Sequence, residues 1–353
     1  MKTLCQWLVM LAVLFGPLAV QAQLRPAVLD TPALDGIGSD RSAILGLARA
    51  GSRLVAVGAR GVVLLSDDEG RHWRQARVPV SSSLTAVQFV DAEHGWAVGH
   101  LGVVLYSEDG GQTWSRQLDG QQLAQLALQA AQAEGSPQRV QEAERLVADG
   151  PDKPWLDLYF QDRQNGFVIG AYNLILRTRD GGRSWAPWMG HLDNPEGLHL
   201  YAMRAADGAL FIAGERGLLL RSRDDGESFQ ALASPYAGSF FGLLAQGQQV
   251  LAFGLRGNAW RSLDQGEHWQ ALASPVQASL VAGLTANDGQ ALLLSQEGEL
   301  LRVEGAQLVP AGRLPGGAFA SLLQAADGRL IGGGLGGLQR YPNDPALAGA
   351  QSQ

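Results

Sequence analysis

The chain has 353 residues, of which 46% are hydrophobic and 17% are charged, a composition that supports a globular core and excludes wholesale disorder. Glycine accounts for 46 residues, nearly double its average usage, and together with 15 prolines it predicts many turns between many short strands. The 27 basic and 34 acidic residues leave a net charge of −7, which argues against a nucleic-acid binder that relies on charge.

The first 22 residues have the features of a cleaved signal peptide. A lysine near the start precedes the apolar stretch Leu8–Val20, and Ala22 is a small residue at the expected cleavage point. About 13 apolar residues fall short of the roughly 20 that cross a bilayer. The single cysteine, Cys5, lies in this segment, so we expect a mature chain without disulfides or thiol nucleophiles. The segment predicts a periplasmic or secreted protein.

One sequence pattern recurs seven times along the chain. Its first copy runs from Val57 to Trp73 and its second from Val98 to Trp114, and the anchor positions of all seven copies are 61, 102, 173, 217, 257, 298 and 337. One gap carries about 30 extra residues, and the others hold a period of about forty. Each unit contains four short apolar or alternating runs separated by turn residues. The pattern predicts an all-β, seven-bladed β-propeller of four-stranded blades, spanning residues 23–345.

The two ends of the chain suggest how the ring closes. The last copy ends after its third predicted strand, near Tyr341, and the segment Leu24–Leu29 precedes the first blade without a partner of its own. We expect this N-terminal segment to supply the missing outer strand of the last blade, because ring closure protects exposed strand edges. Residues 346–353 are expected to form a disordered tail.

Five units contain the Asp-box, Ser/Thr-x-Asp-x-Gly-x-x-Trp/Phe. We expect the aspartate to accept backbone N–H bonds in the turn between strands three and four, the glycine to adopt positive φ, and the aromatic residue to pack between sheets. A side chain repeated around a ring cannot converge on one substrate, so these residues are interpreted as structural rather than catalytic or calcium-binding. The five pairs are Asp68 and Trp73, Asp109 and Trp114, Asp180 and Trp185, Asp224 and Phe229, and Asp264 and Trp269.

The extra residues between blades 2 and 3, at 118–153, predict a helical hairpin. Gln121–Glu134 favours a helix, Gly135 breaks it, and a second helix begins at Pro137 and ends before Gly150. Two interpretations are open for this hairpin: it packs on the propeller, or it is a docking element for a partner.

Two copies of the repeat resemble a known family. The run Gly95–Gly99 leading into Ser107–Trp114, and a second copy over Asn165–Trp185, are similar to the photosystem II assembly and stability factor-like propellers, which are related to the Asp-box (BNR) propellers that include sialidases. The resemblance implies a non-enzymatic propeller that acts beside a membrane and helps a membrane protein or complex to assemble. We interpret the chain as a non-photosynthetic bacterial member, monomeric and without a cofactor, whose partner is a membrane protein or envelope complex.

The turns between strands two and three are expected to share one face of the ring with the blade-to-blade connections and the hairpin. Arginine suits a binding face because its planar group pairs with carboxylates and stacks on aromatic rings. These turns predict a partner-binding rim, although each residue is equally interpretable as a solvated turn residue. The predicted rim residues are Arg60, His100, Tyr172, Arg216 and Arg256, with Gln296 and Leu335 at the two degenerate units.

The enzyme alternative is a sialidase-like glycosidase, with a glycan-binding propeller beside it. Such an enzyme needs an arginine triad, a tyrosine nucleophile with a glutamate partner, and an acid. Arg60, Arg216 and Arg256 offer three arginines and Tyr172 or Tyr201 a tyrosine, but the arginines occupy repeated turn positions. The six histidines show no metal-ligand spacing. We therefore expect no catalytic residues, no metal and no cofactor.

Overall fold

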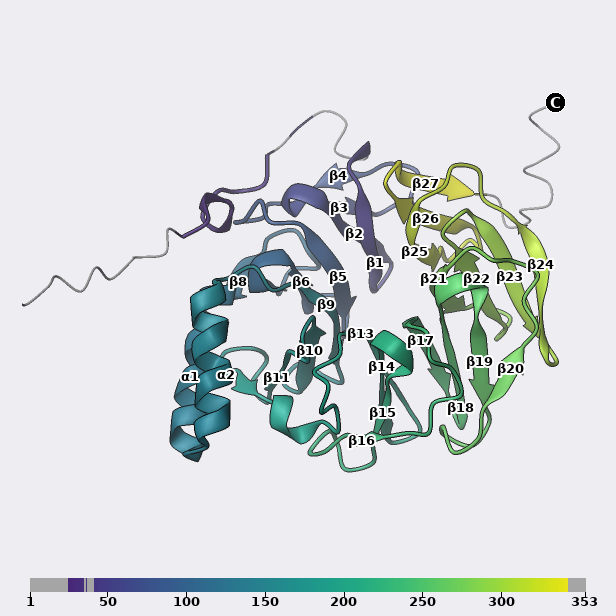
Figure 1. The fold of residues 1–353 in the computed structure, drawn as a ribbon. Helices are drawn as coiled ribbons and strands as arrows, with labels where there is room; N and C mark the ends of the chain where they lie inside the picture. Colours follow the sequence, from purple (N-terminus) through teal and green to yellow (C-terminus); the bar gives the residue numbers. More distant parts are fainter. Residues whose placement is uncertain (1–24, 35, 37–40, 342–353) are drawn as a thin grey trace, which may run out of the picture.

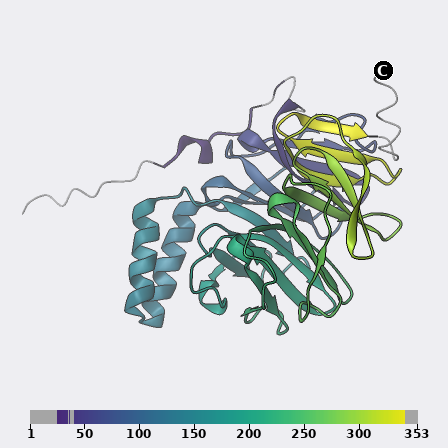
Figure 2. The same cartoon turned by 45° about the vertical axis from the view of Figure 1, so that its right-hand side comes forward.

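A computed structural model describes residues 25–34, 36 and 41–341 of the chain. Seven antiparallel sheets surround a common axis, and a pair of helices stands at one side of the ring (Figures 1 and 2). The predicted seven-bladed, mostly all-β propeller with a helical hairpin after blade 2 is confirmed. The predicted signal peptide, residues 1–22, and the predicted tail, residues 346–353, lie outside the described residues.

Each blade begins with its innermost strand, and the inner strands of neighbouring blades contact one another around the axis. The strands of blades 1 to 3 are β1 (Ile44–Ala50), β2 (Arg53–Gly58), β3 (Val63–Ser66), β4 (Arg74–Gln75), β5 (Leu84–Phe89), β6 (Gly95–Gly99), β7 (Val104–Ser107), β8 (Ser115–Leu118), β9 (Trp155–Phe160), β10 (Gly166–Gly170), β11 (Ile175–Thr178) and β12 (Ala186–Pro187). The strands of blades 4 to 7 are β13 (Leu200–Ala206), β14 (Ala209–Gly214), β15 (Leu219–Ser222), β16 (Gln230–Ala231), β17 (Phe240–Gln246), β18 (Gln249–Gly254), β19 (Ala259–Ser262), β20 (Gln270–Leu272), β21 (Leu280–Thr285), β22 (Ala291–Ser295), β23 (Glu299–Glu304), β24 (Gln307–Arg313), β25 (Phe319–Gln324), β26 (Leu330–Gly334) and β27 (Gly337–Tyr341).

The second strand of a blade is buried on both faces because neighbouring sheets cover it. All five residues of β6, for example, are buried. This burial explains why the second strands read as continuous apolar runs, whereas the outer strands, such as β16 with two exposed residues, have no apolar pattern. The hydrophobic core is accordingly divided into clusters that lie between successive blades.

The expected closure of the ring by an N-terminal strand is wrong. Residues Ala27–Leu29 form a short 3₁₀ helix, η1, and the seventh sheet contains β25, β26 and β27 alone among the described residues. The Ser81 N–H donates to the Val28 carbonyl at 2.9 Å, and the fully buried Leu29 packs in the core cluster of blades 1 and 2. The apolar side chain of Leu29 is buried there, at the junction of blades 1 and 2 and not at the outer edge of blade 7, so the segment does not pair with β27.

Blades 7 and 1 instead meet through side chains. The Arg340 Nε donates to the Glu69 carbonyl at 2.8 Å, and the Ala326 N–H donates to the Glu69 carboxylate at 2.7 Å. Trp73 packs in one apolar cluster with Ile331 of blade 7. The Asp-box of blade 1 therefore seals the junction without any exchange of strands.

The Asp-boxes have the predicted structure. In blade 2 the Ser107 hydroxyl donates to Asp109 at 2.9 Å, the Gly111 N–H donates to the Ser107 oxygen at 2.9 Å, and the Thr113 N–H donates to Asp109 at 2.9 Å. Gly111 has φ of 83°, a conformation that suits glycine. Trp114 is buried in the cluster shared with blade 1. The same bonds recur in the other four boxes, so the motif is a turn lock and an inter-blade wedge.

The box aspartates predict a stability that falls in acid. Hydrogen bonds from Ser222 and then Ser228 lower the pKa of Asp224 from 3.8 to about 2. Because the pKa is lower in the folded chain, the ionised carboxylate stabilises the fold above about pH 4, and that stability is lost as the pH falls toward 2. We expect the free energy of unfolding, measured by urea titration from pH 5 to pH 2, to fall less steeply for Asp224→Asn. Asp225→Asn, a neighbour with no side-chain bond to the turn, should keep the wild-type slope.

Candidate functional site

The turns between the second and third strands gather on one face, here called the rim. The backbone N–H of the central turn residue donates to the next blade: Arg60 to the Ser83 hydroxyl at 3.3 Å and Tyr172 to the His199 ring at 3.0 Å. Arg216 and Arg256 donate in the same way to Ser239 and Ser279. These bonds lie where one blade connects to the next, so the predicted side chains lie on the face of the blade-to-blade connections.

The central turn residue takes the left-handed conformation, which projects its side chain into solvent. Arg60, Tyr172, Arg216 and Arg256 have φ between 52° and 57° and are exposed. In blade 2 that position belongs to Leu101, with φ of 59° and a half-buried side chain, and the exposed His100 precedes it. His100 therefore lies on the predicted turn without being structurally equivalent to the other four residues. The 3₁₀ turns involved are η3 (Ala59–Gly61), η4 (His100–Gly102), η6 (Glu215–Gly217) and η7 (Leu255–Gly257).

The rim arginines differ in their electrostatic surroundings. The Arg216 guanidinium pairs with Glu196 at 2.7 Å, and both side chains are more than half exposed. No residue in the described ranges pairs with the guanidinium groups of Arg60 and Arg256, whose backbone N–H groups are held by the serine hydroxyls. These two arginines are therefore the rim cations available to a carboxylate from outside.

An aromatic file, defined as Tyr172, His199, Tyr201 and Phe241, leads from the rim toward the axis. Ring centroids lie 4.7 Å apart for Tyr172 and His199, 6.2 Å for His199 and Tyr201, and 5.6 Å for Tyr201 and Phe241. Tyr172 is 60% exposed, and burial raises the pKa of Tyr201. The file offers aromatic edges and faces to an apolar or cationic group.

Sequence reasoning missed most of this file. Tyr201 and Phe241 are the second residues of their inner strands, at positions where a register shift leaves one residue without a partner on the neighbouring strand. Every inner strand has such a bulge at its second residue. The sequence does show aromatic residues at the same repeat position in blades 4 and 5. It does not show the bulge that changes their direction, because a bulge is a property of two paired strands.

The hairpin consists of α1 (Gly120–Glu134) and α2 (Pro137–Asp149), and it packs on blade 3 beside β11 and β12 (Figure 1). Leu123 is 1% exposed in a cluster with Trp155, while Ala127, Ala131 and Ala143 join the two helices. The interpretation that the hairpin packs on the propeller is therefore confirmed. Between the hairpin and blade 3 lies a groove of about 710 Å³, lined by alanines of both helices and by charged side chains such as Arg139 and Lys153. Tyr172 lines this groove too, so groove and rim are continuous.

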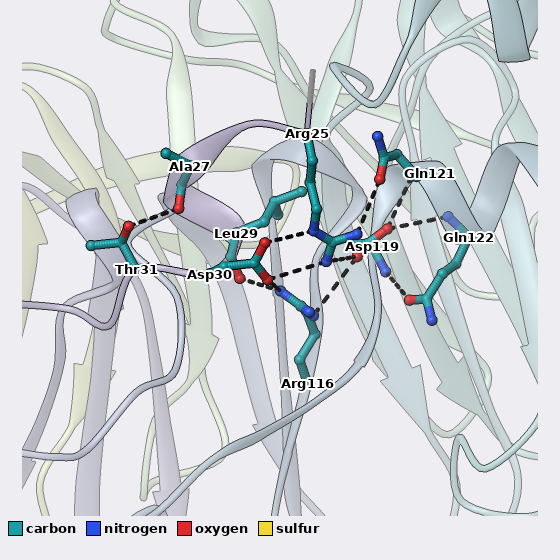
Figure 3. A network of polar contacts seen from close by, with 9 residues as sticks. All are labelled: Arg25, Ala27, Leu29, Asp30, Thr31, Arg116, Asp119, Gln121 and Gln122. Atoms are coloured by element: carbon teal, nitrogen blue, oxygen red, sulfur yellow. Dashed lines mark hydrogen bonds and ion pairs between the residues drawn. The ribbon is translucent and has the colours of Figure 1, made fainter. Parts of the chain in front are cut away.

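A buried carboxylate holds the base of the hairpin (Figure 3). Asp119 is fully buried, accepts the N–H groups of Gln121 and Gln122 at 3.1 Å each, and forms the capping box of α1. Its other oxygen accepts from the Arg25 guanidinium at 2.7 Å, and Arg116 lies 3.7 Å away. The start of the described chain is thus tied to the hairpin.

The three arginines of the sialidase alternative do not occupy one turn or one blade. Arg60, Arg216 and Arg256 lie in separate turns of blades 1, 4 and 5, and Arg216 is engaged by Glu196. Within residues 25–34, 36 and 41–341, no group of three or more His, Cys, Asp or Glu side chains is arranged to hold a metal ion. In the same part of the chain, no helix has the length and apolarity needed to cross a membrane.

Comparison with known proteins identifies relatives. Residues 65–140 and 139–303 match the family described as Photosynthesis system II assembly factor YCF48. A stretch of 77 residues is 34% identical to the Photosystem II assembly lipoprotein Ycf48 of Synechococcus sp. (strain CC9902), covering 22% of this chain and 23% of that relative. The match thus spans about a quarter of the curated relative, which is described as an assembly lipoprotein.

Solved structures support the fold. The chain is similar to YCF48 bound to D1 peptide, with a TM-score of 0.63, 16% identity and coverage of 88% of this chain and 99% of that chain. It is also similar to YCF48 from Cyanidioschyzon merolae, with a TM-score of 0.60, 15% identity and coverage of 85% and 96%. At these identities the likeness establishes the propeller fold. Because the family match extends over residues 65–303, more than half of the chain, the protein belongs to the family of the photosynthesis system II assembly factor YCF48.

Proposed function

We propose that this protein is a non-enzymatic, periplasmic assembly or accessory factor that binds a segment of a membrane-protein client on its rim. Membership of an assembly-factor family supports this function. The observation that carries it is the pair of exposed guanidinium groups of Arg60 and Arg256, which pair with no residue that the structure describes. A bidentate arginine pairs with a carboxylate, so the client segment carries acidic groups. The client is an envelope membrane protein or complex outside photosynthesis.

The rim, the aromatic file and the hairpin groove form one continuous surface through Tyr172. The Lys153 ammonium lies 5.5 Å from the Tyr172 ring, and Tyr172 in turn contacts His199 at the beginning of the file. The cationic rim suits the acidic part of a client segment, and the alanines that line the groove suit its apolar part. On this proposal the hairpin enlarges the binding face while it packs on blade 3.

The rim proposal predicts that charge reversal abolishes capture of the client. The mature chain, used as bait on solubilised envelope membranes of its own host, should enrich one membrane protein or complex, identified by mass spectrometry. Arg60→Glu with Arg256→Glu should reduce that recovery at least about 10-fold, because each change replaces an attraction for carboxylates by repulsion. The melting temperature should stay near the wild-type value, since both side chains are exposed.

A matched control uses Arg77→Glu with Arg183→Glu, two exposed arginines at or beside Asp-box turns, which should leave recovery unchanged. Full recovery with the folded rim variant would refute the rim as the binding surface. Failure of the wild-type chain to enrich any protein, together with cleavage of a sialoside substrate, would favour the glycosidase alternative instead.

A further inference from the structure

Blade 7 has an unpaired outer edge. Among the described residues its sheet has three strands, whereas the other six sheets have four. On one side β27 pairs with β26 from Gly337 to Tyr341, and no described residue pairs with its other side. An edge strand presents N–H and C=O groups that can bind a further strand.

A cavity lies between blades 6 and 7, at the start of β26, the strand that pairs with β27. It has a volume of about 260 Å³ and is lined by Ala286 and Leu292 of blade 6, Leu330 of blade 7 and the exposed Arg302. Polar residues line it as well, namely Asn287, Asp288, Gln290 and Gln324, while the Arg302 guanidinium has no partner among the residues that the structure describes. An arginine in this position stacks favourably on an aromatic ring.

The equivalent position at the junction of blades 7 and 1 is occupied by an aromatic side chain. Leu330 and Leu54 occupy equivalent positions, because each is paired with the last residue of its third strand. At the junction of blades 7 and 1, Leu54 joins Ala325 and Ile331 to bury Trp73, the box aromatic of blade 1. The cavity lined by Leu330, Ala286 and Leu292 is therefore the place where an aromatic residue of a seventh Asp-box would lie.

We propose that the outer edge of blade 7 is a docking site for an extended segment of a partner protein, which adds a fourth strand and places an aromatic side chain in this cavity. A partner segment is favoured as the occupant because the described N-terminal residues, 25–34, lie at blades 1 and 2, and because residues 342–353, which follow β27, contain no aromatic residue. In the five complete boxes the aromatic residue directly precedes the outer strand, as Trp114 precedes β8. The partner segment therefore carries an aromatic residue that is followed directly by a stretch of β-forming residues.

This site goes beyond the proposed function, because it is separate from the rim and does not depend on it. The probe is the peptide Gln112–Leu118 of this chain, which contains the aromatic residue and outer strand of blade 2. It should bind the mature chain saturably in fluorescence anisotropy, and hydrogen exchange should slow at Gly337–Tyr341. The same peptide with Trp114→Ala should bind at least about 10-fold more weakly, because it leaves the cavity empty.

Two variants of the chain test whether the peptide binds in this cavity. Leu292→Trp fills the cavity from blade 6 and should weaken binding about 10-fold, and Arg302→Ala, which keeps the cavity, should weaken it several-fold. The rim variant Arg60→Glu with Arg256→Glu should bind the peptide as the wild type does, so failure of this site is distinguishable from failure of the rim.

Four outcomes would overturn the proposal. The first is the absence of peptide binding to a folded chain, and the second is binding without protection of β27. The third is an affinity that rises about 10-fold when residues 342–353 are deleted, which would assign the edge to the chain's own continuation. A dimer that forms through β27, detected by sedimentation and dissolved by the peptide, would likewise replace the partner strand by a second copy.

Discussion

Replacing Asp119 by alanine should lower the free energy of unfolding by about 3 kcal/mol. The carboxylate is fully buried, caps α1 through two backbone N–H groups and pairs with Arg25 at 2.7 Å. Loss of an N-cap costs about 1 kcal/mol, and removal of one partner from a buried ion pair costs about 3–5 kcal/mol, reduced here because Arg25 and Arg116 are partly exposed. Urea titration followed by tryptophan fluorescence measures the change.

Two further variants separate the contributions of Asp119. Asp119→Asn keeps a capping oxygen but loses the ion pair. Its free energy of unfolding should therefore lie between those of the wild type and the alanine variant. Asp30→Ala removes an ion pair with the same Arg25 at a solvent-exposed position and should lower the free energy of unfolding much less than Asp119→Ala does. If Asp119→Ala and Asp30→Ala have the same free energy of unfolding, the buried Asp119 carboxylate does not hold the hairpin.

Trp96→Ala should be the most destabilising core substitution, at about 4 kcal/mol. The Trp96 ring is fully buried and stacks on Phe160 of blade 3 with centroids 3.7 Å apart and planes 7° from parallel. This contact matters because the hairpin interrupts the chain between blades 2 and 3. At this junction the Gly102 N–H donates to the Lys153 carbonyl at 3.0 Å, at the point where the chain returns from the hairpin to blade 3.

A conservative variant of Trp96 tests whether the stacked ring is what stabilises the junction. Trp96→Phe keeps the stacked ring but loses the hydrogen bond from the indole to the Gly181 carbonyl at 3.3 Å, so it should cost clearly less than the alanine variant. Equal losses for the two variants would show that the hydrogen bond, not the stacked ring, joins the blades. A loss below about 1 kcal/mol for Trp96→Ala would mean that the junction is held elsewhere.

The predictions that came true from sequence concern short-range structure. Asp109, Gly111 and Trp114 behave as expected because all three lie within one turn and its adjoining strand, where hydrogen bonds and φ angles depend on neighbouring residues. The hairpin was predictable for the same reason, since Gly135 adopts φ of 71° and ends α1 locally.

The predictions that failed or were incomplete concern long-range placement. Leu24–Leu29 carried no signal that distinguishes the edge of blade 7 from the groove between blades 1 and 2, and the buried position of Leu29 decided between them. His100 and Leu101 were indistinguishable as turn residues until the backbone placed Leu101 at positive φ. The sequence predicted Arg216 to be a rim cation like Arg60 and Arg256. In the structure it pairs with Glu196, which lies twenty residues earlier in the chain.

The sequence by itself determined the number of blades, the Asp-box turns, the helical hairpin and the face on which the rim lies, because a period of about forty residues and local turn chemistry encode them. Tertiary structure decided which rim arginines are unpaired, where the aromatic file runs, and which sheet is left with an open edge. These features depend on residues far apart in the chain that meet only when seven sheets pack around one axis, and no local pattern specifies such meetings.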